Sequence, residues 1–119
     1  MAALTVQTVT AAGITAAAPV QITAWTTGDT IAGSDVGDRG IWAEVANTSG
    51  GSLDFRVSDV GSTPAGNPAA NGYTTVTVPN AGQGARVFIG KNNIDPATGN
   101  VKVGASTTNA NFTVRLFRY

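Results

Sequence analysis

Aspartate and glutamate are the side chains in this sequence whose chemistry most readily serves catalysis or metal binding. The 119-residue chain holds seven of them, and it contains neither histidine nor cysteine. That composition excludes a triad built on imidazole, a thiolate nucleophile, a Cys/His zinc site and a disulfide scaffold. A site in this chain must therefore be built from carboxylates, hydroxyls, amides and aromatic rings.

Three of the aspartates, Asp29, Asp35 and Asp38, fall in one glycine-rich segment, GDTIAGSDVGD. Carboxylates on a flexible loop can hold Ca²⁺, which prefers oxygen ligands. Their spacing differs from that of the EF-hand loop, however, and aspartate is also a common turn former. The sequence therefore favours turns in this segment, and it predicts no metal and no cofactor.

The other acidic residues give no stronger sign of catalysis. Glu44 is the single glutamate, and the strand alternation places it beside Arg56, which suits a surface ion pair. A two-carboxylate hydrolase that uses Asp54 or Asp59 with another acid stays open, but no spacing supports it. We therefore expect a protein that is not an enzyme.

The charge balance limits the partners. Seven basic and seven acidic residues give a net charge of zero, so the chain lacks the basic field that nucleic-acid binding requires. Weak net repulsion favours self-association, and the neutral surface is either solvated by hydroxyl and amide groups or made to lie against another protein. The sequence shows neither a signal-peptide pattern nor an apolar run of membrane-spanning length, so we expect no membrane partner and synthesis in a cytoplasm.

Hydrophobic residues alternate with polar ones at period two along most of the chain, which is typical of short β-strands. We expect an all-β fold, an antiparallel β-sandwich of Ig-like or jelly-roll-like type, with a small β-barrel as the alternative. Residues 1–19 would form an N-terminal strand or arm with its connection, and residues 20–119 the sandwich domain. No helix and no repeat is expected. The predicted strands, about eight, lie within residues 4–10, 20–25, 41–47, 53–59, 73–79, 86–90, 101–106 and 111–119, with a short further candidate at 29–33.

The runs IWAEVAN (41–47) and LDFRVSD (53–59) flank a Ser/Gly-rich loop and predict a hairpin. Pairing Asn47 with Leu53 turns both apolar faces the same way. That register places Val45 opposite Phe55 inside the fold and Glu44 opposite Arg56 outside.

Trp42 falls on the polar side of its strand, so the alternation predicts an exposed ring. Such a ring can stack on a sugar or anchor a protein interface; alternatively, it fills the space beneath a covering loop such as 61–72. In the last strand, Arg115 and Arg118 would blunt a sheet edge or meet acidic residues of a neighbour. Asn47 and Asn111, which head Asn-x-Ser/Thr sequences, are interpreted as turn residues.

The order of motifs over residues 28–119 resembles a group of small tailed-phage and prophage proteins, the head decoration (cement) or minor capsid proteins encoded near the major capsid gene. The shared features are a D-x-G-x-W-x-E-V-x-N-x-S-G segment, a V-x-V-P-x-x-G strand end, a short Arg-containing strand that ends in Ile-Gly, and a last strand of the type V-x-L/A-x-R/Y. They fall here on Asp38, Gly40, Trp42, Glu44, Val45, Asn47, Ser49 and Gly50, on Val76, Val78 and Pro79, on Arg86, Ile89 and Gly90, and on Val114, Leu116 and Arg118.

This resemblance implies a virion structural protein, made in the bacterial host cytoplasm, that binds the outside of a phage head and stabilises the joints between capsomers. Its partners would be the major capsid protein and further copies of itself, with a trimer at local threefold positions as one arrangement. A carbohydrate-binding module that uses Trp42 and Tyr73, and a tail or baseplate component, are the alternatives. The expected contact residues, some in an N-terminal arm that orders on docking, are Leu4, Val6, Val9, Trp42, Arg115, Arg118 and Tyr119.

Overall fold

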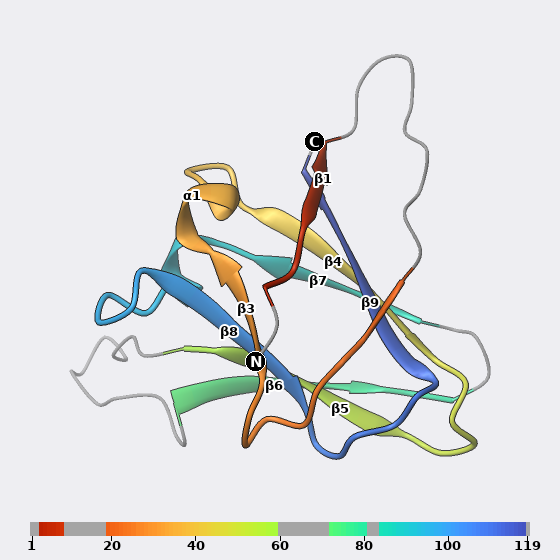
Figure 1. Ribbon diagram of the computed structural model, residues 1–119. Coiled ribbons are helices and arrows are strands. Elements are labelled where there is room, and N and C mark those ends of the chain that lie inside the picture. Colours follow the sequence, from red (N-terminus) through yellow and green to blue (C-terminus); the bar gives the residue numbers. More distant parts are fainter. Residues whose placement is uncertain (1–2, 9–18, 60–71, 81–83, 119) are drawn as a thin grey trace.

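The fold is a β-sandwich of two sheets that pack face to face (Figure 1). The structure, a computed structural model, describes residues 3–8, 19–59, 72–80 and 84–118. Val9, Tyr119 and most of the expected loop at 61–72 lie outside these ranges. Within them the sheets form no closed barrel, so the sandwich prediction is confirmed and the barrel alternative is not.

Nine strands make up the two sheets in the described ranges. The antiparallel sheet has the order β3-β8-β5-β6, with β3 at Asp29–Ala32, β8 at Asn100–Ala105, β5 at Leu53–Ser58 and β6 at Tyr73–Val78. The mixed sheet has the order β1-β9-β4-β7, with β1 at Val6–Thr8, β9 at Phe112–Arg118, β4 at Ile41–Asn47 and β7 at Ala85–Ile89. The two-residue strand β2, Val20–Gln21, also pairs with β9. The short candidate at 29–33 is thus a strand.

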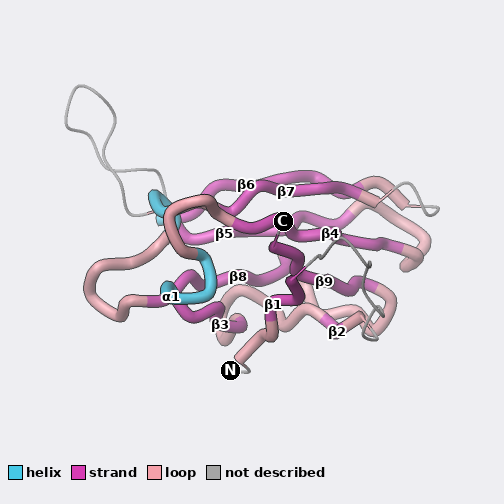
Figure 2. The backbone as a smooth tube through the Cα atoms, turned by 90° about the horizontal axis from the view of Figure 1, so that it is seen from above, coloured by secondary structure: helices cyan, strands magenta, loops and turns pink. Residues whose placement is uncertain are grey.

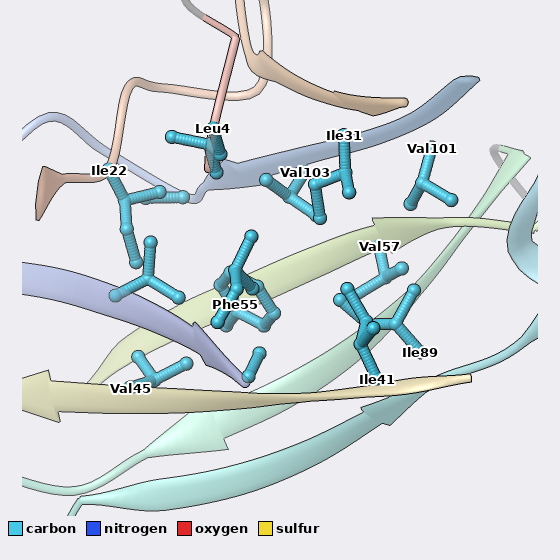
Figure 3. Close-up of a cluster of buried hydrophobic side chains, with 14 of the residues drawn as sticks. Leu4, Ile22, Ile31, Ile41, Val45, Phe55, Val57, Ile89, Val101 and Val103 are labelled. Atoms are coloured by element: carbon cyan, nitrogen blue, oxygen red, sulfur yellow. The ribbon is translucent and has the colours of Figure 1, made fainter. Parts of the chain in front are cut away.

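Alternation decides which side chains enter the core. In β4, Ile41, Ala43 and Val45 are fully buried, while Trp42 and Ala46 face solvent. Figure 3 shows Ile41 and Ile89 of the mixed sheet directed toward Val57 of the other sheet. Small and β-branched side chains dominate this interface because they pack well on pleated surfaces. The buried apolar residues are Leu4, Ile22, Ile31, Val36, Ile41, Ala43, Val45, Phe55, Val57, Val78, Ile89, Val101, Val103, Ala105, Phe112, Val114, Leu116 and Phe117.

The predicted hairpin between residues 41–47 and 53–59 is wrong. β4 pairs with β7 and β9, whereas β5 pairs with β6 and β8, so the connection is an arch that crosses from one sheet to the other. Val45 and Phe55 are both buried, as expected, but they belong to opposing sheets. A strand with one buried face can equally pair with its neighbour or pack against it, and alternation does not distinguish the two.

Asn47 holds this arch in place from a fully buried position. Its Nδ2 donates hydrogen bonds to the backbone oxygens of Gly51 and Val78, at 2.8 and 2.9 Å, and its Oδ1 accepts one from the Ser49 N–H. The side chain therefore hydrogen-bonds the backbone of the turn and connects it to β6 of the other sheet. These bonds explain how Asn47 acts as a turn residue.

Short helical elements in the described ranges depart from the expectation of none. α1 is the four-residue helix Gly33–Val36, which buries Val36, and η2 is a 3₁₀ turn at Lys91–Asn93. In the part of the chain that the structure describes, no helix has the length and apolar character to cross a membrane.

The chain ends differ from expectation in two ways. Leu4 is 6% exposed and lies in the core, and its N–H donates to the Thr30 oxygen of β3 at 2.8 Å. β9 is not an edge strand, because β4 flanks it on one side and β1 and β2 on the other. β1 runs parallel to β9, so early and late parts of the chain complete one sheet.

Candidate interaction surface

The acidic residues do not converge on a site. Asp29 is buried, and its carboxylate accepts hydrogen bonds from the Thr23 N–H and Oγ1 at 3.1 and 3.0 Å. Asp35 faces Arg118 at 3.8 Å, and Asp38 faces Lys91 at 3.4 Å. The described residues contain no group of three acidic side chains placed to hold a metal ion.

Glu44 lies beside two arginines, and neither of them is Arg56. The register places Arg86 of β7 opposite Glu44 on one side and Arg115 of β9 on the other. The Arg86 guanidinium lies 3.8 Å from the Glu44 carboxylate; the Arg86 side chain is mostly exposed and that of Glu44 is half-buried. The expected pairing of Glu44 with Arg56 is therefore wrong: Glu44 forms its ion pair with Arg86 of β7, whereas Arg56 lies on β5 in the other sheet.

The outer face of the mixed sheet carries two ordered rows of side chains. Trp42 lies opposite Phe117 on one side and Phe88 on the other, and we call these three residues the aromatic row. The row beside it, the charged row, consists of Arg115, Glu44 and Arg86. Trp42 is 39% exposed and Phe88 is 50% exposed, so the predicted exposure of Trp42 is confirmed.

The position of Phe88 depends on two glycines. The ring packs edge-to-face on Trp42, with centroids 5.3 Å apart. A Cβ atom at Gly40 would come within 2.4 Å of the Phe88 ring, and one at Gly90 within 2.9 Å. Gly40 also has a φ of +77°, a conformation that favours glycine. Gly40 and Gly90 thus leave room for the Phe88 ring, because neither has a side chain that would collide with it.

The structure brings together only part of the expected contact set. Trp42 and Arg115 share the outer face of the mixed sheet, in neighbouring rows. Val6 is half-buried and packs against the core, and Leu4 lies inside it. Arg118 donates a hydrogen bond to the Asp35 oxygen, which fastens α1 to the end of β9. Val9 and Tyr119 lie outside the described residues.

A second aromatic cluster, which the alternation did not reveal, covers the outer face of the antiparallel sheet. Trp25 and Tyr73 pack edge-to-face with centroids 4.9 Å apart. The Lys102 ammonium lies 4.3 Å from the centre of the Trp25 ring, and the Arg56 guanidinium 4.8 Å from that of Tyr73. Tyr73 and Trp42 therefore lie on different sheets and do not form one sugar-binding platform. The spacing of Trp25 and Tyr73 in the sequence carries no signal of their contact.

Comparison of the chain with protein-family models, with curated proteins and with solved structures found no match.

Proposed function

We propose that the chain is a non-enzymatic structural protein of a tailed-phage head, a decoration protein that binds the capsid exterior and stabilises the joints between capsomers. The resemblance over residues 28–119 supports the phage-head part of this proposal. The zero net charge and the dispersed acidic residues support a binding role over a nucleic-acid or catalytic one.

The observation that carries the proposal is the aromatic row beside the charged row. Large rings supply much of the binding energy at protein interfaces, and a rim of charges adds specificity. Here two half-exposed rings, Trp42 and Phe88, lie on a regular sheet face next to Arg115, Glu44 and Arg86. A repeated capsid surface would multiply many such modest contacts into stable attachment.

This assignment replaces part of the expected contact set. Leu4 holds the two sheets together from the core and Arg118 binds α1, so neither side chain is offered to a capsid. Docking through Trp42, Phe88 and Arg115 instead requires no rearrangement of the N-terminal strand.

The test uses phage heads assembled without this protein and the purified chain added back. We expect saturable binding at a fixed copy number, with density on the outside of the head in electron cryo-microscopy. Trp42→Ser should weaken binding at least about tenfold, as loss of an interface anchor does. Val20→Ser is the matched control, because Val20 is also exposed (47%) but lies outside the aromatic row. Density confined to the tail, or equal binding by Trp42→Ser, would contradict the proposal.

Exposure of the Trp42 ring also favours a second candidate, a carbohydrate-binding module displayed on the virion. The neighbouring Glu44 and Arg86 side chains could hydrogen-bond sugar hydroxyls while the sugar stacks on the indole. A titration with a glycan panel, read out by tryptophan fluorescence, separates the two roles. Trp42→Phe leaves Trp25 as the remaining tryptophan, so a quench that this variant abolishes favours sugar binding.

A further inference from the structure

The strand β7 is an open edge of the sandwich. It is the last strand of the mixed sheet in the part of the chain that the structure describes, and Figure 2 shows it on the side of the sandwich opposite β1, β2 and β3. Two of the other three edges are protected: β1 and β2 are very short, and the Leu4 N–H donates a hydrogen bond to the oxygen of Thr30 on β3. β6 exposes mainly threonines, whereas β7 exposes Phe88.

The ladder pattern identifies the backbone groups that point out of this edge. The Thr48 N–H donates to the Asn111 oxygen, in register with the pairing of β4 and β9. Because backbone groups of a central antiparallel strand alternate between its two neighbours, even-numbered residues of β4 bond β9 and odd-numbered ones bond β7. Across the register, Val87 directs its backbone groups to β4, and Arg86 and Phe88 direct theirs to the free edge. No backbone partner for these two residues lies within the described ranges.

We infer that a second copy of this chain pairs with β7 across a twofold axis at Val87, so that the two mixed sheets become one continuous sheet. Antiparallel self-pairing keeps both apolar faces inward only if paired residue numbers have an even sum. Centring the axis on Arg86 would place two guanidinium groups opposite each other, and centring it on Phe88 would leave Ala85 and Arg86 beyond the end of the partner strand. Centring it on Val87 pairs the full strand.

This register is self-complementary in its side chains and its backbone. Arg86 of each copy lies opposite Phe88 of the other, which places a cation beside an exposed ring twice. The same two pairs exchange backbone hydrogen bonds, because Arg86 and Phe88 are the residues whose backbone groups face outward. A net charge of zero offers little repulsion between copies. The inference goes beyond the proposed function and does not rest on it, since such a pair would form in free solution.

Cysteine cross-linking tests the twofold axis, because the natural chain has no cysteine. Val87 would face its own copy in a non-hydrogen-bonded pair, at a Cα separation of about 4.5 Å that a disulfide can span. We expect Val87→Cys to form a disulfide-linked dimer under mild oxidation. Thr75→Cys on β6 is the matched control: Thr75 is exposed, whereas Val87 is half-buried, so random collisions would favour the control. Equal or faster cross-linking at position 75 would overturn the inference.

Sedimentation velocity over a range of concentrations tests the edge itself. We expect the natural protein to change from monomer to dimer within the micromolar range. Arg86→Pro removes an outward N–H that bonds no other backbone group in the described ranges, and it should weaken the dimer about tenfold more than Arg86→Ala, which keeps that N–H. Circular dichroism checks that each variant is folded. A natural protein that stays monomeric at high micromolar concentration, or a folded Arg86→Pro variant that dimerises as Arg86→Ala does, would overturn the inference.

Discussion

Gly104 lies directly beneath Trp25 on the outer face of the antiparallel sheet. A Cβ atom at position 104 would come within 2.7 Å of the Trp25 Cα, and the Trp25 N–H donates to the oxygen of the next residue, Ala105, at 2.9 Å. The missing side chain thus lets the segment before β3 come close to β8, with which it forms backbone hydrogen bonds at Ala105. Trp25, held in this position, is part of a series of cation and ring contacts that runs from Lys102 through Trp25 and Tyr73 to Arg56.

Replacement of Gly104 by alanine should therefore displace Trp25. We expect Gly104→Ala to lower the free energy of unfolding by about 1–3 kcal/mol, as steric overpacking does. Urea denaturation measures the loss, and the fluorescence maximum of the natural tryptophans should move to longer wavelength. Gly51→Ala is the control, since a Cβ there meets nothing within 4 Å. A change within about 0.5 kcal/mol is expected for it; equal effects at both positions would remove the special role of Gly104.

Leu4 gives a test of the N-terminal strand. The side chain is 6% exposed in the core, so Leu4→Ala should destabilise the fold by about 2–5 kcal/mol. Val20→Ala, at a site that is 47% exposed, should change the unfolding free energy by less than about 0.5 kcal/mol. Thermal and urea unfolding measure both. If instead Leu4→Ala kept full stability and lost only capsid binding, the segment would be the docking arm that the sequence analysis expected.

The arch between β4 and β5 can be checked with paired cysteines. Glu44 and Arg86 are direct neighbours across two strands, so Glu44→Cys with Arg86→Cys should form an intramolecular disulfide. Glu44→Cys with Arg56→Cys should not, because those residues lie on the outer faces of sheets that pack about 10 Å apart. Mass spectrometry of the oxidised proteins gives the result. A disulfide between positions 44 and 56, and none between 44 and 86, would instead support the hairpin between residues 41–47 and 53–59.

Asn47 connects the arch to β6, and removal of its side chain should lower the free energy of unfolding. Asn47→Ala deletes two donated hydrogen bonds and leaves the Val78 oxygen without that donor, so we expect a loss of about 1–3 kcal/mol in urea denaturation. Asn80→Ala removes an exposed bond to the Gly50 N–H from the same loop and should lose less than about 1 kcal/mol. A larger loss for Asn80→Ala would mean that the exposed contact, not the buried amide, fixes the loop.

For β4 and β5 the sequence predicted the buried face correctly but not the strands with which each one pairs. Ile41, Ala43 and Val45 alternate cleanly, and all three enter the core. The same alternation could not decide whether β5 lies beside β4 or across from it, because either arrangement hides Phe55. Strand partners depend on contacts between distant segments, which a local pattern does not record.

The candidate surface, too, was predicted only in part from the sequence. Exposure of Trp42 followed from its place on a polar face, but the neighbours that make it a surface come from β7 and β9. Phe88 lies in a short run, RVFIG, that reads as a buried strand. Its exposure follows from the position of β7 at the end of the sheet, which only the assembled fold determines.

The parallel pairing of Val6 with Leu116 has a consequence for synthesis in the cell. A ribosome releases β1 more than a hundred residues before β9, so the first strand must wait for a partner that emerges late. Such distant pairings slow folding, and β1 can pair with β9 only after translation has passed Leu116. A ribosome stalled earlier should therefore carry a nascent chain that proteases still cut readily.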